Sequence, residues 1–133
     1  MTRAALAVLS VALLTAAMTP QAARAAASDD VLCAMMAESA KAVNAAGPVA
    51  VDAVTTQESV SVDCDARRIL TRFSRTDNAA DQPQGWQDNW QSQLDAAYCG
   101  DTAMRDIIAG GWTFAELTTF ADGEEFEIKA ACE

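Results

Sequence analysis

The sequence has 133 residues, and its nineteen acidic residues outnumber nine basic ones to give a formal charge of −10. Such acidity argues against nucleic acid and anionic membrane surfaces as partners, because both bind basic surfaces. Histidine is absent, which excludes Ser-His-Asp and Cys-His catalysis and removes the commonest metal ligand.

Residues 1–27 have the three parts of a secretory signal peptide. Arg3 lies in a short basic head, an apolar run too short for a membrane span follows, and small residues come next, where cleavage after Ala25 and after Ala27 fit equally well. We expect residues 28–133 to form one soluble domain in the periplasm or the medium, without a membrane anchor. Loss of the leader would bring the formal charge to −12, since it holds two arginines and no acid.

Residues 29–46 are predicted to form the first helix. They are rich in alanine, and Leu32, Met36 and Val43 are spaced for one helical face. Asp29 or Asp30 can cap the start, and a Gly-Pro pair ends the pattern.

Two alternating segments then predict an antiparallel hairpin. Val60 and Val62 alternate with polar residues, as do Ile69 and Phe73, and a turn around residues 64–66 separates the two segments. Four of the basic residues gather on the second segment and its flanks: Arg67, Arg68, Arg72 and Arg75. They are a candidate interaction surface for a partner protein; the alternative is charge that protects an edge strand from aggregation.

A polar loop at residues 77–84 precedes a helix in which Trp86, Trp90 and Leu94 recur every four residues, and Ala97 or Tyr98 continues the row. Residues four apart share one helical face. We interpret the row as a stripe packed on the sheet. The alternative is a ligand platform built on Trp86 and Trp90.

A short helix capped by Asp101 and a second hairpin complete the chain. A three-residue turn at residues 121–123, with Gly123 left-handed, would pair Phe120 with Glu124. This register places the apolar side chains of both strands on one face, whereas a two-residue turn would divide them between two faces, so we prefer the former. Leu117 fits only the opposite face.

The four cysteines indicate two disulfides, as expected of a small exported domain. Their order along the predicted elements favours Cys33–Cys64 and Cys99–Cys132. No Cys-x-x-Cys pair and no calcium-loop spacing occurs, so neither a metal site nor a cofactor is expected. A pair of carboxylates is the hydrolytic chemistry that stays open; with nineteen acids its signal is weak, and we expect no enzyme and no catalytic residue.

The order of elements in the last third of the chain is similar to that of a known family. Residues 98–132 contain a helix that begins next to a cysteine, an aromatic strand, an Asp-Gly turn and a strand that ends in cysteine. This order resembles small exported bacterial proteins of the "putative quorum-sensing-regulated virulence factor" type, which implies an α+β fold and export. No catalytic or ligand residue carries over.

We therefore predict one α+β domain: a helix, a hairpin, two helices and a hairpin, with an antiparallel sheet of about four strands covered on one face. The expected function is that of a small accessory or inhibitor-like protein that binds a partner protein. A small-ligand module with an aromatic pocket at Trp86 and Trp90 is the alternative, and a carboxylate-dependent hydrolase comes last.

Overall fold

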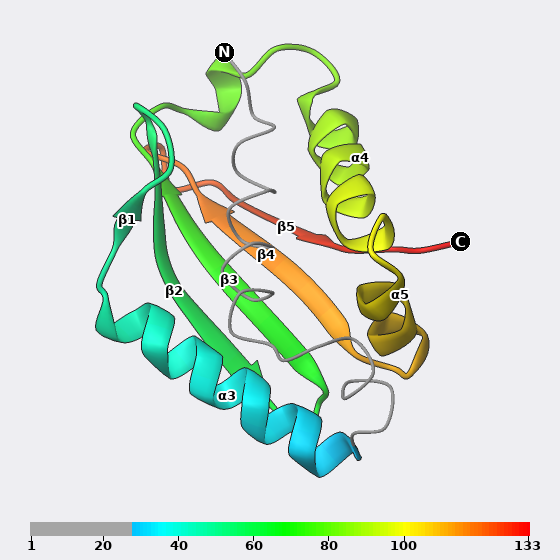
Figure 1. The fold of residues 1–133 in the computed structure, drawn as a ribbon. Coiled ribbons are helices and arrows are strands. Elements are labelled where there is room, and N and C mark those ends of the chain that lie inside the picture. The colour runs from blue at the N-terminus through cyan, green and yellow to red at the C-terminus, as the bar shows by residue number, and fades with distance from the viewer. Residues whose placement is uncertain (1–27) are drawn as a thin grey trace.

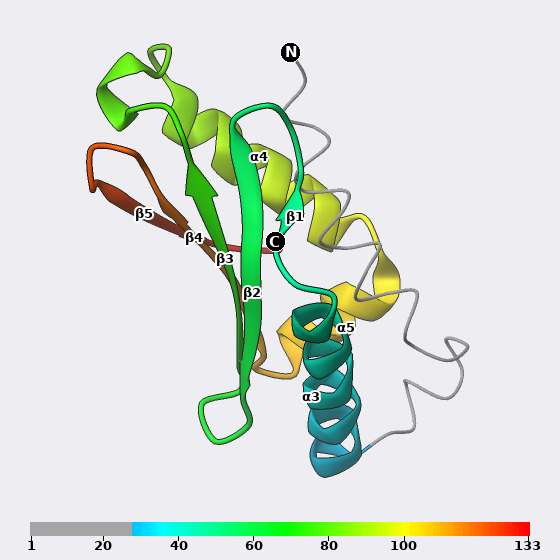
Figure 2. The ribbon, with the colours of Figure 1, turned by 90° about the vertical axis from the view of Figure 1, so that its left-hand side faces the viewer.

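The computed structural model of the chain describes residues 28–133, and the predicted signal peptide lies outside the described residues. In chain order the elements are α3 (Asp29–Ala45), β1 (Val49–Ala50), β2 (Thr55–Asp63), β3 (Arg68–Arg75), the 3₁₀ turn η1 (Ala79–Asp81), α4 (Trp86–Cys99), α5 (Thr102–Ala109), β4 (Thr113–Thr119) and β5 (Glu125–Lys129). The strands form one sheet in the order β1-β2-β3-β4-β5. The described helices lie on one face of it (Figure 1), and the opposite face is bare of helices (Figure 2). The predicted α+β class is confirmed.

Helix α3 packs along β2, the strand next to the sheet edge. Ser28, and not Asp29 or Asp30 as predicted, caps it by accepting a hydrogen bond from the Val31 N–H. At the other end of α3 the Asn44 amide donates to the Val60 carbonyl at 2.7 Å and accepts from the Val60 N–H at 2.8 Å. A side chain thus bonds both main-chain groups of Val60, as a neighbouring strand would.

The first predicted hairpin is confirmed, because β2 and β3 pair antiparallel from Thr55 opposite Arg75 to Asp63 opposite Arg68. A bulge interrupts the register between Gln57 and Ser59. The two-residue strand β1 adds an edge that the sequence pattern did not reveal.

The prediction of a wholly antiparallel sheet is wrong in one place, since β3 and β4 pair in parallel. The chain leaves the end of β3, returns across the sheet through α4 and α5, and enters β4 beside the start of β3 (Figure 1). There the Thr113 N–H donates to the Arg67 carbonyl at 2.8 Å. Parallel neighbours require a connection of this length, and two helices provide it.

The second hairpin has the predicted three-residue turn. Thr119 lies opposite Glu125, and the Phe120 N–H donates to the Glu124 carbonyl at 2.9 Å. Gly123 has φ +85°, a conformation that costs glycine little. The register directs Phe114, Ile128 and their neighbours toward the helices.

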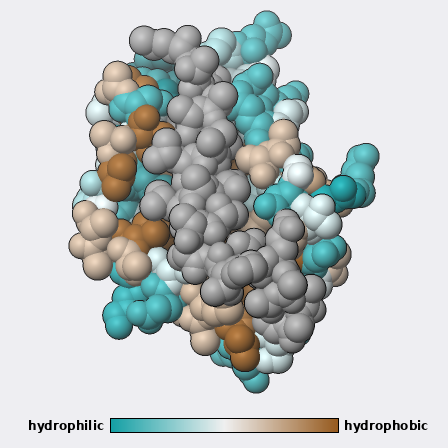
Figure 3. Space-filling view, in the orientation of Figure 1, coloured by the Kyte–Doolittle hydropathy of each residue, from teal (hydrophilic) through white to brown (hydrophobic). Residues whose placement is uncertain are grey.

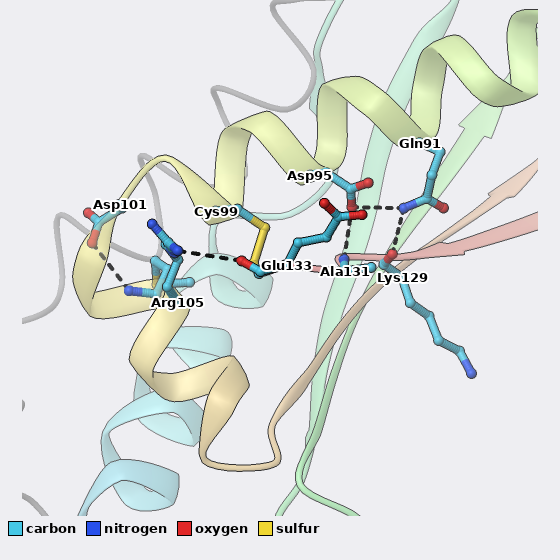
Figure 4. Close-up of a disulfide and its surroundings, with 10 residues drawn as sticks. Gln91, Asp95, Cys99, Asp101, Arg105, Lys129, Ala131 and Glu133 are labelled. Carbon is cyan, nitrogen blue, oxygen red and sulfur yellow. Dashed lines mark hydrogen bonds between the residues drawn. A yellow bond between two sulfur atoms is a disulfide. The ribbon is translucent and has the colours of Figure 1, made fainter.

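The described chain end is fixed to α4 (Figure 4). Cys99 is bonded to Cys132, as the sequence favoured, and the same holds for the other pair, Cys33 and Cys64. The Gln91 amide donates to the Lys129 carbonyl at 2.7 Å, and Asp95 accepts from the Ala131 N–H at 2.8 Å. These bonds pair main-chain groups at the end of β5 that the sheet leaves without a strand partner.

Candidate functional site

Four aromatic rings meet between the start of α4 and the β4–β5 hairpin, and we call Trp86, Trp90, Phe120 and Phe126 the aromatic cluster. The Trp86 ring meets Trp90 and Phe126 edge to face, with centroids 4.8 Å apart in each pair. Trp90 stacks on Phe120 at 5.9 Å with an interplanar angle of 13°. Phe120 is buried, and the other three rings are half-buried. The helical spacing of the tryptophans thus places both rings against the sheet while leaving part of each at the surface.

Arg75 fills the inner side of this cluster. Its guanidinium lies 5.4 Å from the Trp90 centroid and 5.9 Å from the Phe120 centroid, a cation–π arrangement. The same group donates to both carboxylate oxygens of Asp77, at 2.7 and 2.5 Å, and to the Thr55 hydroxyl at 2.8 Å. The hydrogen bond from Arg75 is the main cause that lowers the pKa of Asp77, and a second bond from Gln82 supports it. A fixed, paired cation therefore supports the Trp90 and Phe120 rings.

The structure divides the four arginines of the candidate interaction surface. Arg75 is buried on the helix-covered face, whereas Arg72 is exposed on the bare face. Arg67, with φ +49°, joins the β2–β3 turn to the Gly110 carbonyl and to Asp29. Arg68 pairs with Glu127 at 2.8 Å across β4. The arginines do not form one patch, and the edge-strand interpretation is wrong because β3 is the central strand.

A strip of buried polar side chains crosses the helix-covered face. It consists of Gln57 on β2, Thr71 on β3, and Glu116 and Thr118 on β4, and we call it the polar strip. Thr71 lies directly opposite Glu116, and Phe73 lies between Gln57 and Thr118 in the register. The four residues are between 1% and 8% exposed. Of their side-chain nitrogen and oxygen atoms, the one that is both buried and without a hydrogen-bond partner among the described residues is Oε1 of Glu116.

Glu116 is the unusual member of the strip. It is 8% exposed, and its Oε1 atom has no hydrogen-bond partner among the described residues. Burial raises the pKa of Glu116 to about 7. Tyr98, on α4, is buried too; burial first, and then the charge of Glu116, raises its pKa. When it is ionised, this interior carboxyl group has no ion pair among the described residues to offset its negative charge.

Glu116 was not among the predicted site residues, although the sequence contains a signal for it. Glu116 and Thr118 fall on the same alternating face as Phe114 and Phe120. The preferred register of the second hairpin therefore already places both polar side chains on the inner face of the sheet, although the prediction named only the aromatic residues of that face.

The rest of the described surface has small apolar areas and no cluster of metal-binding side chains. Figure 3 shows hydrophilic surface at the upper right, where Figure 1 places α4, and smaller apolar areas at the left edge, where Figure 1 places β1, and at the lower edge near α3. Val31, in the first turn of α3, is the exposed large hydrophobic residue of the described part, at 51%. Within residues 28–133 no three cysteine or acidic side chains gather to hold a metal, and no helix is both long and apolar enough to cross a bilayer.

Two solved structures share this fold. One is described as a "putative secreted protein" from Pseudomonas aeruginosa; it is 20% identical, covers 77% of this chain and 93% of its own, and has a TM-score of 0.60. The second is the pilotin of the Vibrio vulnificus type 2 secretion system, 14% identical over 77% of this chain and 90% of its own, with a TM-score of 0.56. No protein-family model matches the sequence, and no curated protein is significantly similar to it. At these identities the likeness shows that the chain has the fold of the two proteins.

Proposed function

We propose that this chain is an exported, disulfide-stabilised bacterial protein that acts by binding another protein and has no catalytic role. The observation that carries the proposal is the aromatic cluster, in which the half-buried rings of Trp86 and Trp90 are held against each other and Arg75 lies against the Trp90 ring. Tryptophan dominates the binding energy of many protein interfaces. Rings that are already fixed lose little side-chain entropy when a partner covers them.

The comparisons support this proposal. A fold shared with a type 2 secretion pilotin over 77% of the chain fits an accessory protein of an export system, and the fold of a secreted protein fits export itself. Two disulfides are typical of the periplasm or the medium. The kinship with quorum-sensing-regulated virulence factors implied by residues 98–132 forms part of the same proposal.

The two alternatives have less support. A small ligand at Trp86 and Trp90 would compete with Arg75 for the Trp90 ring, and a cationic ligand would also meet its charge. A carboxylate-dependent hydrolase needs two acids that converge. The buried acid Glu116 has Thr71 and Ile128 as its cross-strand neighbours, so its position favours no such pair.

Differential capture of partners tests the proposal. The protein purified after export of the full chain would be immobilised and exposed to the exported proteins of its source bacterium, with bound proteins identified by mass spectrometry. We expect a partner that binds the wild type, is at least tenfold depleted with Trp86→Ala, and is retained with Val31→Ala. Val31 provides the matched control because it is an exposed apolar residue outside the cluster.

Thermal unfolding of each variant would establish that Trp86→Ala is folded at the temperature of the experiment. If the partner binds the folded Trp86→Ala and Val31→Ala proteins equally, the aromatic cluster is not the interface. If no partner binds the wild type, a role in protein binding is refuted.

A further inference from the structure

Strand β5 forms one edge of the sheet, and Figure 2 shows it at the outer margin. The Ala130 N–H donates to the Phe114 carbonyl at 2.9 Å, so in this register the even-numbered residues hydrogen-bond to β4. Residues of an antiparallel strand alternate between positions that bond the neighbouring strand and positions that do not. The N–H and C=O groups of Glu125 and Glu127 therefore point away from β4, at the open side of the sheet.

Side chains of α4 occupy the far end of this edge (Figure 4). Gln91 donates to the Lys129 carbonyl, and Asp95 accepts from the Ala131 N–H; both main-chain groups belong to the same outward-facing, odd-numbered set. Among the described residues no hydrogen bond covers the outward main-chain groups of the two glutamates. The α4 side chains thus close one end of the edge and leave the first half of β5 open to a further strand.

The opposite edge of the sheet is protected. The short strand β1 pairs with β2 there. Farther along β2, the Asn44 amide bonds both main-chain groups of Val60, and α3 packs against the same strand. An extended segment of another chain would therefore meet fewer obstacles at β5 than at the opposite edge.

The side chains that flank the open edge differ between the two faces of the sheet. Phe126 points toward the helices and meets Trp86 with centroids 4.8 Å apart, and both rings are half-buried. Glu125 and Glu127 point to the bare face, because successive side chains of a strand alternate. Glu127 has an arginine partner across β4, whereas Glu125 has no ion pair among the described residues. Residues 122–129 hold four acids and one lysine, so this edge is acidic.

This geometry specifies the segment that fits. An added strand would form hydrogen-bonded pairs at Glu125 and Glu127, which places a non-hydrogen-bonded pair at Phe126, where facing side chains approach most closely. The residue opposite Phe126 would pack on that ring and on Trp86, so an apolar side chain suits it. The residue opposite Glu125 would lie beside an unpaired carboxylate, so a basic side chain suits it.

We propose that β5 is a strand-addition site, at which the partner protein docks an extended segment with an apolar side chain against Phe126 and Trp86 and a lysine or arginine beside Glu125. The inference rests on the proposed function and specifies the partner segment that the aromatic cluster receives. In this mode of recognition the main-chain bonds provide affinity and the alternating side chains provide specificity. The excess of acids in the chain favours approach of a basic segment.

Hydrogen exchange measured by nuclear magnetic resonance tests the proposal. The probe is an acetylated and amidated pentapeptide in which valine alternates with lysine, with valine at both ends, added at millimolar concentration to the protein purified after export. We expect it to slow the exchange of the Glu125 and Glu127 N–H groups with water several-fold and in a saturable way. The Phe126 N–H, which faces β4, should keep its exchange rate.

Two methylated peptides of equal composition provide the control. In the predicted register the lysine N–H groups face β5 and the valine N–H groups face solvent. N-methylation of the two lysines should therefore abolish the protection, whereas N-methylation of the last two valines should preserve it. Equal effects of the two methylated peptides, or no slowing with the unmodified one, would overturn the proposal.

Variants of the protein test the same contacts from the other side. Glu127→Pro removes an outward N–H at an edge position that tolerates proline, and Glu127→Ala removes the same carboxylate but keeps the N–H. The proline variant should bind the peptide at least tenfold more weakly than the alanine variant; equal binding would contradict strand addition. If Glu127→Pro does not fold, the methylated peptides decide. Glu125→Gln should weaken binding several-fold, whereas Glu38→Gln, at an exposed position of α3, should not.

The partner experiment separates this inference from the function on which it rests. A partner that binds wild type and Glu127→Pro equally, yet requires Trp86, overturns strand addition and leaves the protein-binding function intact. A peptide that protects the outward N–H groups of β5 when no exported protein is captured supports the strand site but refutes the protein-binding function.

Discussion

Replacement of Glu116 by glutamine should change the pH dependence of stability. Burial raises the pKa of Glu116 from 4.5 to about 7. An acid whose pKa is raised in the folded state is ionised more readily in the unfolded state, so ionisation opposes folding. The displacement of about 2.5 pH units corresponds to about 3 kcal/mol. This cost is fully present above about pH 7, shrinks as the pH falls, and vanishes below about pH 4.5.

Glutamine keeps the shape of the side chain and does not titrate. We therefore expect Glu116→Gln to raise the free energy of unfolding by up to about 3 kcal/mol at pH 8.5 relative to its effect at pH 4.5. Urea unfolding followed by tryptophan fluorescence, at several pH values between these limits, measures the difference. The titratable group that faces Glu116 from α4 is Tyr98, and it stays protonated throughout this range because its pKa is raised.

Glu124→Gln is the control, since it removes a negative charge at an exposed position of the same hairpin. Its effect on the free energy of unfolding should be small and nearly independent of pH. An effect of Glu116→Gln that is equally flat would refute the reasoning, because it would show that the carboxyl group ionises in the folded protein as easily as in water.

Three further substitutions test contacts of the fold by urea unfolding. Asn44→Ala removes both hydrogen bonds to the Val60 main chain and should cost about 1–2 kcal/mol. Gly123→Ala introduces a side chain at φ +85° and should cost about 1 kcal/mol. Arg75→Met removes the partner of Asp77 and should cost about 2 kcal/mol, less than for a fully buried pair because the Asp77 side chain is 30% exposed; it should also shift the tryptophan emission.

Each of these has a result that would contradict it. An unchanged Asn44→Ala protein would mean that water replaces the amide at no cost. A neutral Gly123→Ala would mean that the turn adopts another conformation. A stable Arg75→Met protein with unaltered emission would mean that the cation does not hold the Trp90 ring in place.

The hairpins could be predicted because residues close together in the sequence determine their strands and turns. Alternation around Val60 and Phe73, and the Asp-Gly turn before Glu124, specify strands and a turn through residues close in sequence. The turn length followed from one requirement, that Phe120 and Phe126 share a face, and the structure has that register.

The parallel pairing of β3 with β4 could not be predicted from local sequence patterns. Thr71 and Glu116 are paired neighbours, yet no local pattern relates them. Their contact depends on how α4 and α5 return the chain, and a pattern of alternation is the same for either strand direction. The two-residue strand β1 is too short to give a periodic signal.

The candidate site was predictable in part. Helical spacing correctly brought Trp86 and Trp90 to the sheet. The distribution of the arginines was missed because strand alternation sends Arg72 and Arg75 to opposite faces, which grouping by sequence proximity ignores. The functions assigned to these residues stay predictions.

Each disulfide joins two cysteines that are consecutive in the sequence, Cys33 with Cys64 and Cys99 with Cys132. A chain that emerges amino terminus first, from the ribosome or through a membrane pore, presents Cys33 and Cys64 together before Cys99 appears. The first thiol pair to become available is therefore the native pair, and so is the second. Oxidation in order of emergence gives the correct bonds without reshuffling, so maturation of the protein should require an oxidant but no disulfide isomerase.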